Sequence, residues 1–164
     1  MADIYELWIA LDLRDELSEA EIAELQWHLG LGPQPGSLGI VREFPVVVED
    51  DDGEPVVEDV PEPLLAQQGE AAKVGGALTA ALARRGSRGG GGWAVTARQE
   101  VHPDGWERLG ELLVWLAAKS VPQQRQFDGS VGVGWIRFYE EERPERVRVL
   151  GGEALWPEAV DVTG

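Results

Sequence analysis

A strand followed by a helix in residues 7–30 constrains the fold of this chain more than any other stretch. Apolar residues alternate with other residue types over 7–13, and this period of two predicts a strand with one apolar face. Ser18 and Glu21 then have the spacing of a capping box, in which each side chain accepts a hydrogen bond from the backbone N–H of the other residue. Apolar residues recur at helical spacing over 22–29, which predicts a helix that begins after Ser18.

The same order of elements returns later in the chain. The pattern over 93–101 predicts a strand, and Asp104 and Glu107 repeat the spacing of a capping box. In the helix that follows, three leucines stand 87 positions after the apolar stripe of the first helix: Leu109, Leu112 and Leu116 correspond to Ile22, Leu25 and Leu29. We therefore predict an internal duplication, with pseudo-repeats over 4–62 and 92–150.

Each predicted helix is followed by a predicted hairpin. The first hairpin has strands over 40–49 and 56–60 around an Asp-Gly turn, and the second has strands over 131–139 and 146–149. Glycines occupy alternate positions at the start of the strand over 131–139, which predicts that a large group packs closely over that face.

The segment between the two halves is predicted to be helical. The spacing of Val74, Leu78 and Ala81 favours a connecting helix over 64–85, although two glycines lie in its interior. A glycine-rich linker over 86–92 follows this helix and leads into the second half.

These elements together predict an α+β fold in a single globular domain over 1–164. Each half consists of a βαββ unit. The two units would form an antiparallel sheet with helices on one face, with an additional helix joining the halves. This arrangement resembles a duplicated ferredoxin-like plan. The resemblance concerns the fold only, and that fold carries many unrelated functions, so it implies no particular activity.

The net charge of −16 favours some classes of binding partner and disfavours others. Nucleic acids and anionic membranes attract basic proteins, so we expect neither as a direct partner, whereas a basic protein would be steered towards this chain. The charge also fits a role in solubility alone. The chain has no cysteine, which excludes disulfides and thiolate metal sites. The N-terminal residues lack the basic start and apolar core of a signal peptide, so we expect a cytoplasmic location.

Carboxylates crowd into the first predicted hairpin: Asp50, Asp51, Asp52, Glu54, Glu58 and Asp59. One interpretation is a solvated hairpin tip whose charges discourage edge-to-edge aggregation. A second is a recognition patch for a basic protein surface. A third is a calcium loop, but aligning Gly53 with the glycine of such a loop places Val48 at the first ligand position. We therefore predict no metal site.

A second candidate site rests on residues near the ends of predicted elements, where pockets are often built: Trp8, Asp12, Trp27, His28 and His102. Histidine suits proton transfer near neutral pH, but neither histidine accompanies a recognisable nucleophile motif. His28 also fits the boundary of an amphipathic helix, and His102 fits a hydrogen-bond acceptor at the start of the second helix. The two tryptophans also fit core packing or a subunit interface. We predict no catalytic residue and no cofactor.

The charge and these patterns lead to two hypotheses of function. The first is a non-enzymatic acidic binding protein, of the immunity or inhibitor type, that recognises a basic protein partner through the first hairpin. The second is a small-molecule-binding protein or enzyme with a pocket between the sheet and the helices. The missing catalytic motif favours the first hypothesis. A homodimer that forms through the edge strands of the sheet is a further expectation.

Overall fold

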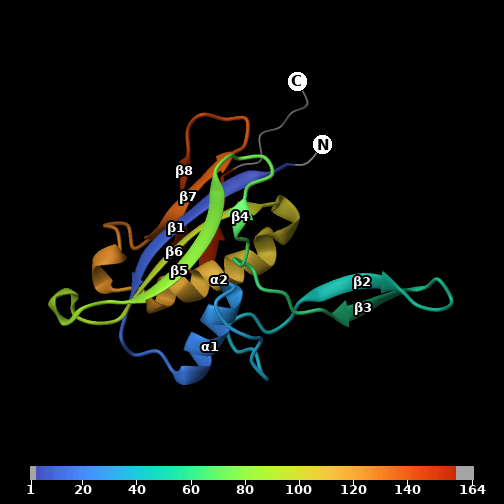
Figure 1. The fold of residues 1–164 in the computed structure, drawn as a ribbon, viewed down its shortest axis with the longest axis horizontal. Coiled ribbons are helices and arrows are strands. Elements are labelled where there is room, and N and C mark those ends of the chain that lie inside the picture. The colour runs from blue at the N-terminus through green and yellow to red at the C-terminus, as the bar shows by residue number, and fades with distance from the viewer. Residues whose placement is uncertain (1–2, 158–164) are drawn as a thin grey trace.

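The computed structural model of the protein describes residues 3–157, which form two helices and a large antiparallel sheet (Figure 1). The helices are α1 (Glu19–His28) and α2 (Trp106–Lys119). The seven strands of the sheet lie in the spatial order β4 (Gly69–Glu70), β5 (Ala77–Arg84), β6 (Trp93–Val101), β1 (Tyr5–Leu13), β7 (Val131–Phe138), β8 (Glu145–Leu150) and β9 (Glu153–Leu155). A separate two-stranded sheet consists of β2 (Pro45–Glu49) and β3 (Pro55–Asp59).

β1 is the central strand of the large sheet. It pairs antiparallel with β6 on one side and with β7 on the other. Its period of two sets the two faces of the sheet, because Leu7, Ile9 and Leu11 are buried whereas Trp8 and Ala10 are exposed. The strand predicted over 7–13 is therefore confirmed, and it decides which face of the whole sheet is covered.

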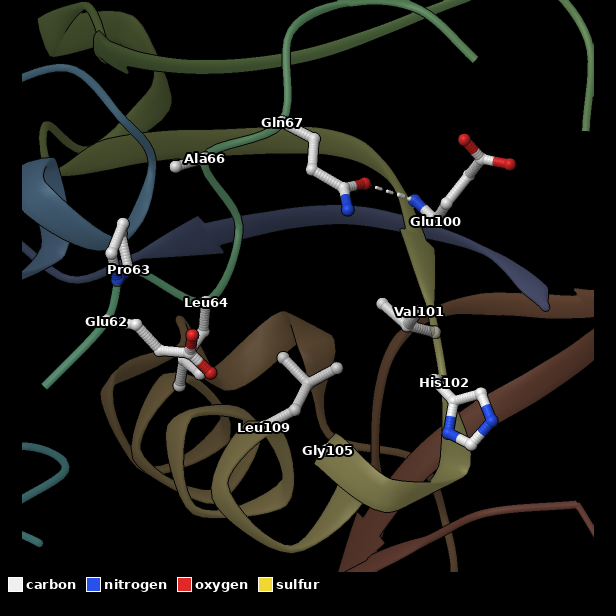
Figure 2. A pocket seen from close by; sticks show the side chains of 10 residues that line it. All are labelled: Glu62, Pro63, Leu64, Ala66, Gln67, Glu100, Val101, His102, Gly105 and Leu109. Atoms are coloured by element: carbon white, nitrogen blue, oxygen red, sulfur yellow. Dashed lines mark hydrogen bonds between the residues drawn. The ribbon is translucent and has the colours of Figure 1, made fainter. Parts of the chain in front are cut away.

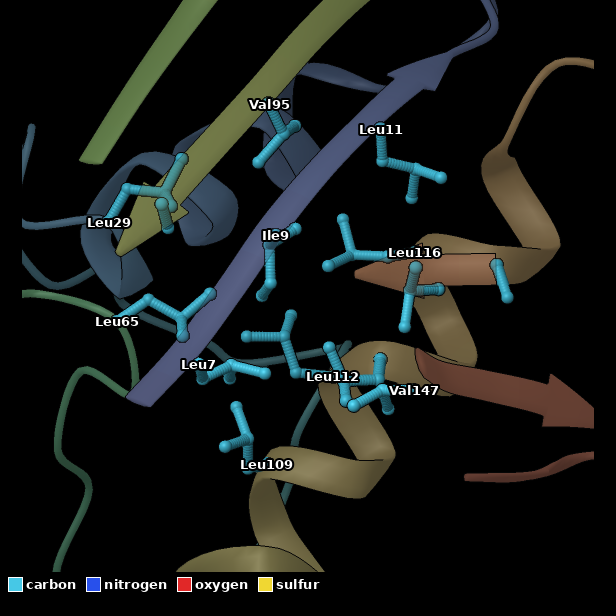
Figure 3. Close-up of a cluster of buried hydrophobic side chains, with 14 of the residues drawn as sticks. Leu7, Ile9, Leu11, Leu29, Leu65, Val95, Leu109, Leu112, Leu116 and Val147 are labelled. Carbon is cyan, nitrogen blue, oxygen red and sulfur yellow. The ribbon is translucent and has the colours of Figure 1, made fainter. Parts of the chain in front are cut away.

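The core lies between the apolar face of the sheet and the two helices. α2 directs Leu109, Leu112 and Leu116 towards the apolar side chains of β1 (Figure 3). Leu25 of α1 and Leu29, which caps the end of that helix, belong to the same buried cluster. Both helices of residues 3–157 thus cover one face of the sheet, and the other face is open to solvent.

The two helices begin in different ways. α1 has the predicted capping box, with the N–H of Glu21 donating to Ser18 Oγ at 3.1 Å and the N–H of Ser18 donating to Glu21 Oε1 at 3.0 Å. α2 follows a 3₁₀ turn at Pro103–Gly105, where His102 Nδ1 accepts from the N–H of Asp104 at 3.1 Å. The capping box predicted for α2 is wrong, and His102 supplies the acceptor at that point.

The predicted connecting helix over 64–85 is wrong, because this segment forms β4 and β5. Gly75 and Gly76 turn the chain between the two strands with φ angles of 81° and 67°, a conformation that glycine adopts without steric cost. β5 then alternates, with Leu78 and Ala80 buried, and pairs with β6. Residues four apart share a face in both a helix and a strand, so Leu78 and Leu82 satisfied the helical pattern while belonging to a strand.

The two halves also differ at their hairpins. β7 and β8 belong to the large sheet, where β7 pairs with β1, whereas β2 and β3 pair only with each other. Packing β2 and β3 against the body would desolvate the carboxylates on these strands, which costs free energy. The structure therefore confirms an α+β fold with a mainly antiparallel sheet, but not the duplicated ferredoxin-like plan.

Candidate functional site

The hairpin of β2 and β3, which we call the arm (residues 45–59), projects from the body beside the helices (Figure 1). Its turn is closed by Asp50, whose carboxylate accepts from the N–H groups of Asp52 and Glu54, each at 2.9 Å. Gly53 has a φ of 77° and donates its N–H to the carbonyl of Asp50 at 3.0 Å. The predicted Asp-Gly turn is confirmed, and Asp50 is the residue that holds it together.

The root of the arm is anchored in the core by Phe44. This ring is buried and meets Trp27 edge-on, with 6.2 Å between the ring centroids. The N–H of Phe44 donates to Asp59 Oδ1 at 2.7 Å, and Arg108 of α2 donates to the carbonyl of Pro45. Asp59 therefore fixes the direction in which the arm leaves the body.

The remaining predicted partner-binding carboxylates are free. Within residues 3–157 no hydrogen bond or ion pair engages the side chains of Asp51, Asp52, Glu54 and Glu58. The arm contains seven carboxylates and no Lys, Arg or His, so it has no basic group of its own to neutralise them. The tip thus presents a concentrated negative charge to solvent.

The arm also exposes apolar side chains. Val47 and Val57 are cross-strand partners that are 69% and 70% exposed, and both project from the same face of the hairpin. Val46 and Val56 are exposed as well. A two-stranded hairpin alone is marginally stable in water. A partner that covers the exposed valines of this projecting hairpin would therefore stabilise it.

The second candidate site does not form a single pocket. Trp8 lies on the open face of the sheet, and Asp12 lies at the end of β1 with 3.7 Å between its Oδ1 and Arg85 Nε. Trp27 and His28 are buried residues of α1, and His102 caps the 3₁₀ turn that precedes α2. Apart from Trp27 and His28, whose ring centroids are 4.7 Å apart, these residues therefore occupy separate places in the fold.

One pocket of about 400 Å³ does lie between the sheet and α2, at His102 (Figure 2). Its lining residues are Glu62, Pro63, Leu64, Ala66, Gln67, Glu100, Val101, His102, Gly105 and Leu109. The carboxylate of Glu100 is already occupied, since it accepts from the N–H groups of Ala72 at 2.6 Å and Lys73 at 2.8 Å. Glu62 is the group of this lining that a small ligand with a cationic head could contact, since His102 Nδ1 already accepts from the N–H of Asp104.

The sequence analysis missed a buried pair in α1, Glu24 and His28. Glu24 is 1% exposed, and its carboxylate accepts from the N–H groups of three consecutive loop residues, Gly39, Ile40 and Val41, at 2.6 to 3.0 Å. His28 is fully buried, with 3.1 Å between its Nε2 and Glu24 Oε2, and its Nδ1 lies 3.4 Å from the N–H of Leu64. This pair ties the loops on both sides of the arm to α1. The spacing of four residues on one helix was the only sequence signal for it.

The pair makes stability depend on pH. Burial lowers the pKa of His28 below its ordinary value of 6.5, and this effect outweighs the raising effect of Glu24 beside it. The unfolded chain therefore binds a proton at His28 more readily than the folded chain. We expect the free energy of unfolding to be highest above pH 6.5 and to fall as the pH decreases from 7.5 to 5.5.

Urea unfolding across this pH range measures the change in the free energy of unfolding. The expected change is about 1.4 kcal/mol for each unit by which the pKa of His28 differs between the folded and unfolded chains. His28→Gln is the control, because it removes the titrating group and should flatten the pH dependence. Equal slopes in the wild type and the variant would contradict the assignment to His28. The carboxylates whose pKa values are lowered, Glu6, Glu21 and Asp128, titrate below this window.

Comparison with known proteins adds no functional assignment: no family model, curated protein or solved structure matches the chain. No helix in the described residues is long and apolar enough to cross a membrane. Over the same 3–157 range, no group of three or more His, Asp or Glu side chains is placed to hold a metal ion.

Proposed function

We propose that the protein is a non-enzymatic binding protein that recognises a basic protein partner through the arm. The observation that carries this proposal is the pairing of two features on one projecting element. The valine pair Val47 and Val57 is exposed on both strands, and the free carboxylates of the tip lie next to it. An apolar centre beside a charged rim is the usual composition of a protein interface.

The charge of the whole chain supports a basic partner. The net charge of −16 and the field of the tip attract a positively charged surface before contact, which raises the association rate. The valines then supply the apolar area whose burial stabilises the complex, at about 25 cal/mol per Å². An inhibitor of the immunity type works in this way when its acidic surface covers the basic, functional surface of its target.

The surroundings of the two histidines favour binding over catalysis. His28 is fully buried and engaged by Glu24 and Leu64, so no substrate can reach its imidazole. His102 uses Nδ1 to accept from Asp104 at the start of α2. The pocket beside His102 is the place for the alternative function, small-molecule binding, and a metabolite that raises the melting temperature of the protein would favour that alternative.

Neutralising the tip is expected to weaken partner binding. The triple variant Asp51→Asn, Asp52→Asn and Glu54→Gln removes three free charges and leaves Asp50, which closes the turn, in place. We expect the wild type to capture a basic protein from a lysate of the source organism at low salt. The triple variant should lose at least about tenfold in affinity, and raised salt should weaken the wild-type complex.

A matched control removes three exposed carboxylates elsewhere on the surface. Glu140→Gln, Glu141→Gln and Glu142→Gln lie in the turn between β7 and β8 and change the net charge by the same amount. This control should bind the partner as the wild type does. The proposal fails if no basic partner is captured at low salt, or if the tip variant binds as tightly as the control.

A further inference from the structure

The open face of the sheet carries a row of side chains from five adjacent strands. Cross-strand pairing aligns Thr79 of β5, Arg98 of β6, Trp8 of β1, Trp135 of β7 and Arg146 of β8 at one level. The two central tryptophans are 41% and 39% exposed. Large aromatic side chains left half-exposed beside arginine are typical anchors of protein interfaces.

The two arginines of this row differ in their availability. The guanidinium of Arg98 lies 5.4 Å from the ring centroid of Trp8, but it also donates to the carboxylate of Glu6 and to the carbonyl of Ala77. Burial raises the pKa of Glu6, yet the hydrogen bonds from Arg98 and Arg137 outweigh this and keep the pKa below its ordinary value. Arg98 is therefore committed to an internal ion pair.

Arg146 is the free cation of the row. Its guanidinium lies 5.6 Å from the ring centroid of Trp135, and its side chain is exposed. Among the described residues no carboxylate forms an ion pair with it. Small residues flank the tryptophans on the same face, since Ala10, Ala81 and Thr96 are exposed. The open face is thus apolar at its centre and basic at one end.

The arm has the complementary features. On one face it carries the exposed pair Val47 and Val57, and Glu49 projects from that same face because it lies two residues along the strand from Val47. Two exposed apolar pairs can therefore meet, with a free carboxylate beside a free guanidinium. The sizes also agree: five adjacent strands span about 19 Å, and a five-residue strand of the arm spans about 17 Å.

The arm cannot reach the open face of its own chain. Its root residue Phe44 is buried in the core on the side of the helices, and the open face is the opposite side of the sheet. Figure 1 shows the arm extending away from the sheet. A complementary contact between the arm and the open face must therefore join two molecules.

We infer that the arm of one copy docks on the open sheet face of a second copy. Val47 and Val57 pack on Trp8 and Trp135, and Glu49 pairs with Arg146. This contact goes beyond the proposed function, because it assigns a receptor surface on the chain itself. It also keeps the valines of the arm covered until a basic partner competes for them.

The net charge sets the salt dependence of this self-association. Two copies of charge −16 repel each other at long range. The screening length is about 8 Å at about 0.15 M salt and about 30 Å at about 0.01 M, whereas the docked groups touch. Self-association is therefore tighter at about 0.15 M than at about 0.01 M salt. Binding of a basic partner has the opposite salt dependence, which separates the two contacts experimentally.

Sedimentation velocity on the full chain tests the inference with two charge reversals. We expect the wild type to associate with rising concentration, and Arg146→Glu and Glu49→Arg each to weaken the association by about tenfold or more. An equimolar mixture of the two variants should associate again, because the reversed arm of one then meets the reversed face of the other. Arg88→Glu, at an exposed turn residue, changes the net charge by the same amount as Arg146→Glu and should associate like the wild type.

Three results would overturn the inference: a wild type that stays monomeric at about 0.15 M salt, a reversal variant that associates like the wild type, or a mixture that does not associate. Thermal unfolding verifies that each variant is folded, and Arg146→Gln replaces Arg146→Glu if the reversal unfolds the chain. Arg146→Glu has an intact arm, so it should still capture a basic partner. If partner capture fails but self-association behaves as expected, the proposed function fails and this inference stands. If self-association fails but partner capture behaves as expected, this inference fails and the proposed function stands.

Discussion

Replacing Glu24 with alanine is expected to lower the free energy of unfolding by about 3–5 kcal/mol. The carboxylate of Glu24 is the acceptor for the N–H groups of Gly39, Ile40 and Val41, and it lies 3.1 Å from His28 Nε2. Removing it leaves three backbone donors without their partner, and each buried donor left unsatisfied costs about 1–3 kcal/mol. Urea unfolding monitored by tryptophan fluorescence measures the change.

The control for Glu24→Ala is Glu19→Ala on the same helix. Glu19 is exposed in the first turn of α1, so its loss should cost less than about 1 kcal/mol. Glu24→Gln retains one acceptor oxygen but replaces the other with an NH₂ donor. Its loss of unfolding free energy should lie between those of Glu19→Ala and Glu24→Ala. A Glu24→Ala variant as stable as Glu19→Ala would show that water satisfies the loop donors and that the pair does not hold the loops.

The loops that Glu24 and His28 hold lie on both sides of the arm. Glu24→Ala should therefore affect the arm as well as the free energy of unfolding. Val41 lies three residues before Phe44, and the backbone of Leu64 and Leu65 is bound to His28 just after the arm. The buried pair thus positions both ends of the segment that carries the arm. A rigid root lowers the entropy lost when the arm binds.

Local signals in the sequence predicted the elements that depend on neighbouring residues. The capping box of Ser18 and Glu21 fixes the start of α1, and the alternation of β1 fixes which of its side chains are buried. The Asp-Gly turn fixed the position of the arm for the same reason. Each of these signals needs only residues within a few positions of each other.

Elements that depend on distant partners were harder to predict. The segment around Leu78 is a strand because β6 lies beside it, and its apolar spacing fits a helix as well as a strand. The row of Trp8, Trp135 and Arg146 depends on the register of β7 with β8 and with β1, which is more than 100 residues away in sequence. Glu24 was missed because its partners are backbone N–H groups, which leave no trace in the side-chain sequence.

Replacing Gly134 of β7 with alanine is expected to lower the free energy of unfolding by at least about 3 kcal/mol. Gly134 lies at an irregularity in the pairing of β7 with β8, directly opposite Ile9 of the central strand. A Cβ atom at Gly134 would overlap the backbone carbonyl oxygen of Trp8 and would come within 3.1 Å of the Cα of Ile9. The backbone of a central strand cannot move aside without breaking its ladder of hydrogen bonds.

Gly132→Ala in the same strand is the matched comparison, because its obstacle is a side chain. A Cβ atom at Gly132 would overlap the guanidinium of Arg146, so the predicted large group lies over Gly132 but not over Gly134, which meets backbone atoms of β1. That guanidinium is the end of a flexible, exposed side chain and can move into solvent, so we expect a loss below about 1 kcal/mol. Thermal or urea unfolding of the two variants side by side measures the difference. Equal losses would mean that β1 and β7 separate more easily than the close approach of Gly134 to Trp8 implies.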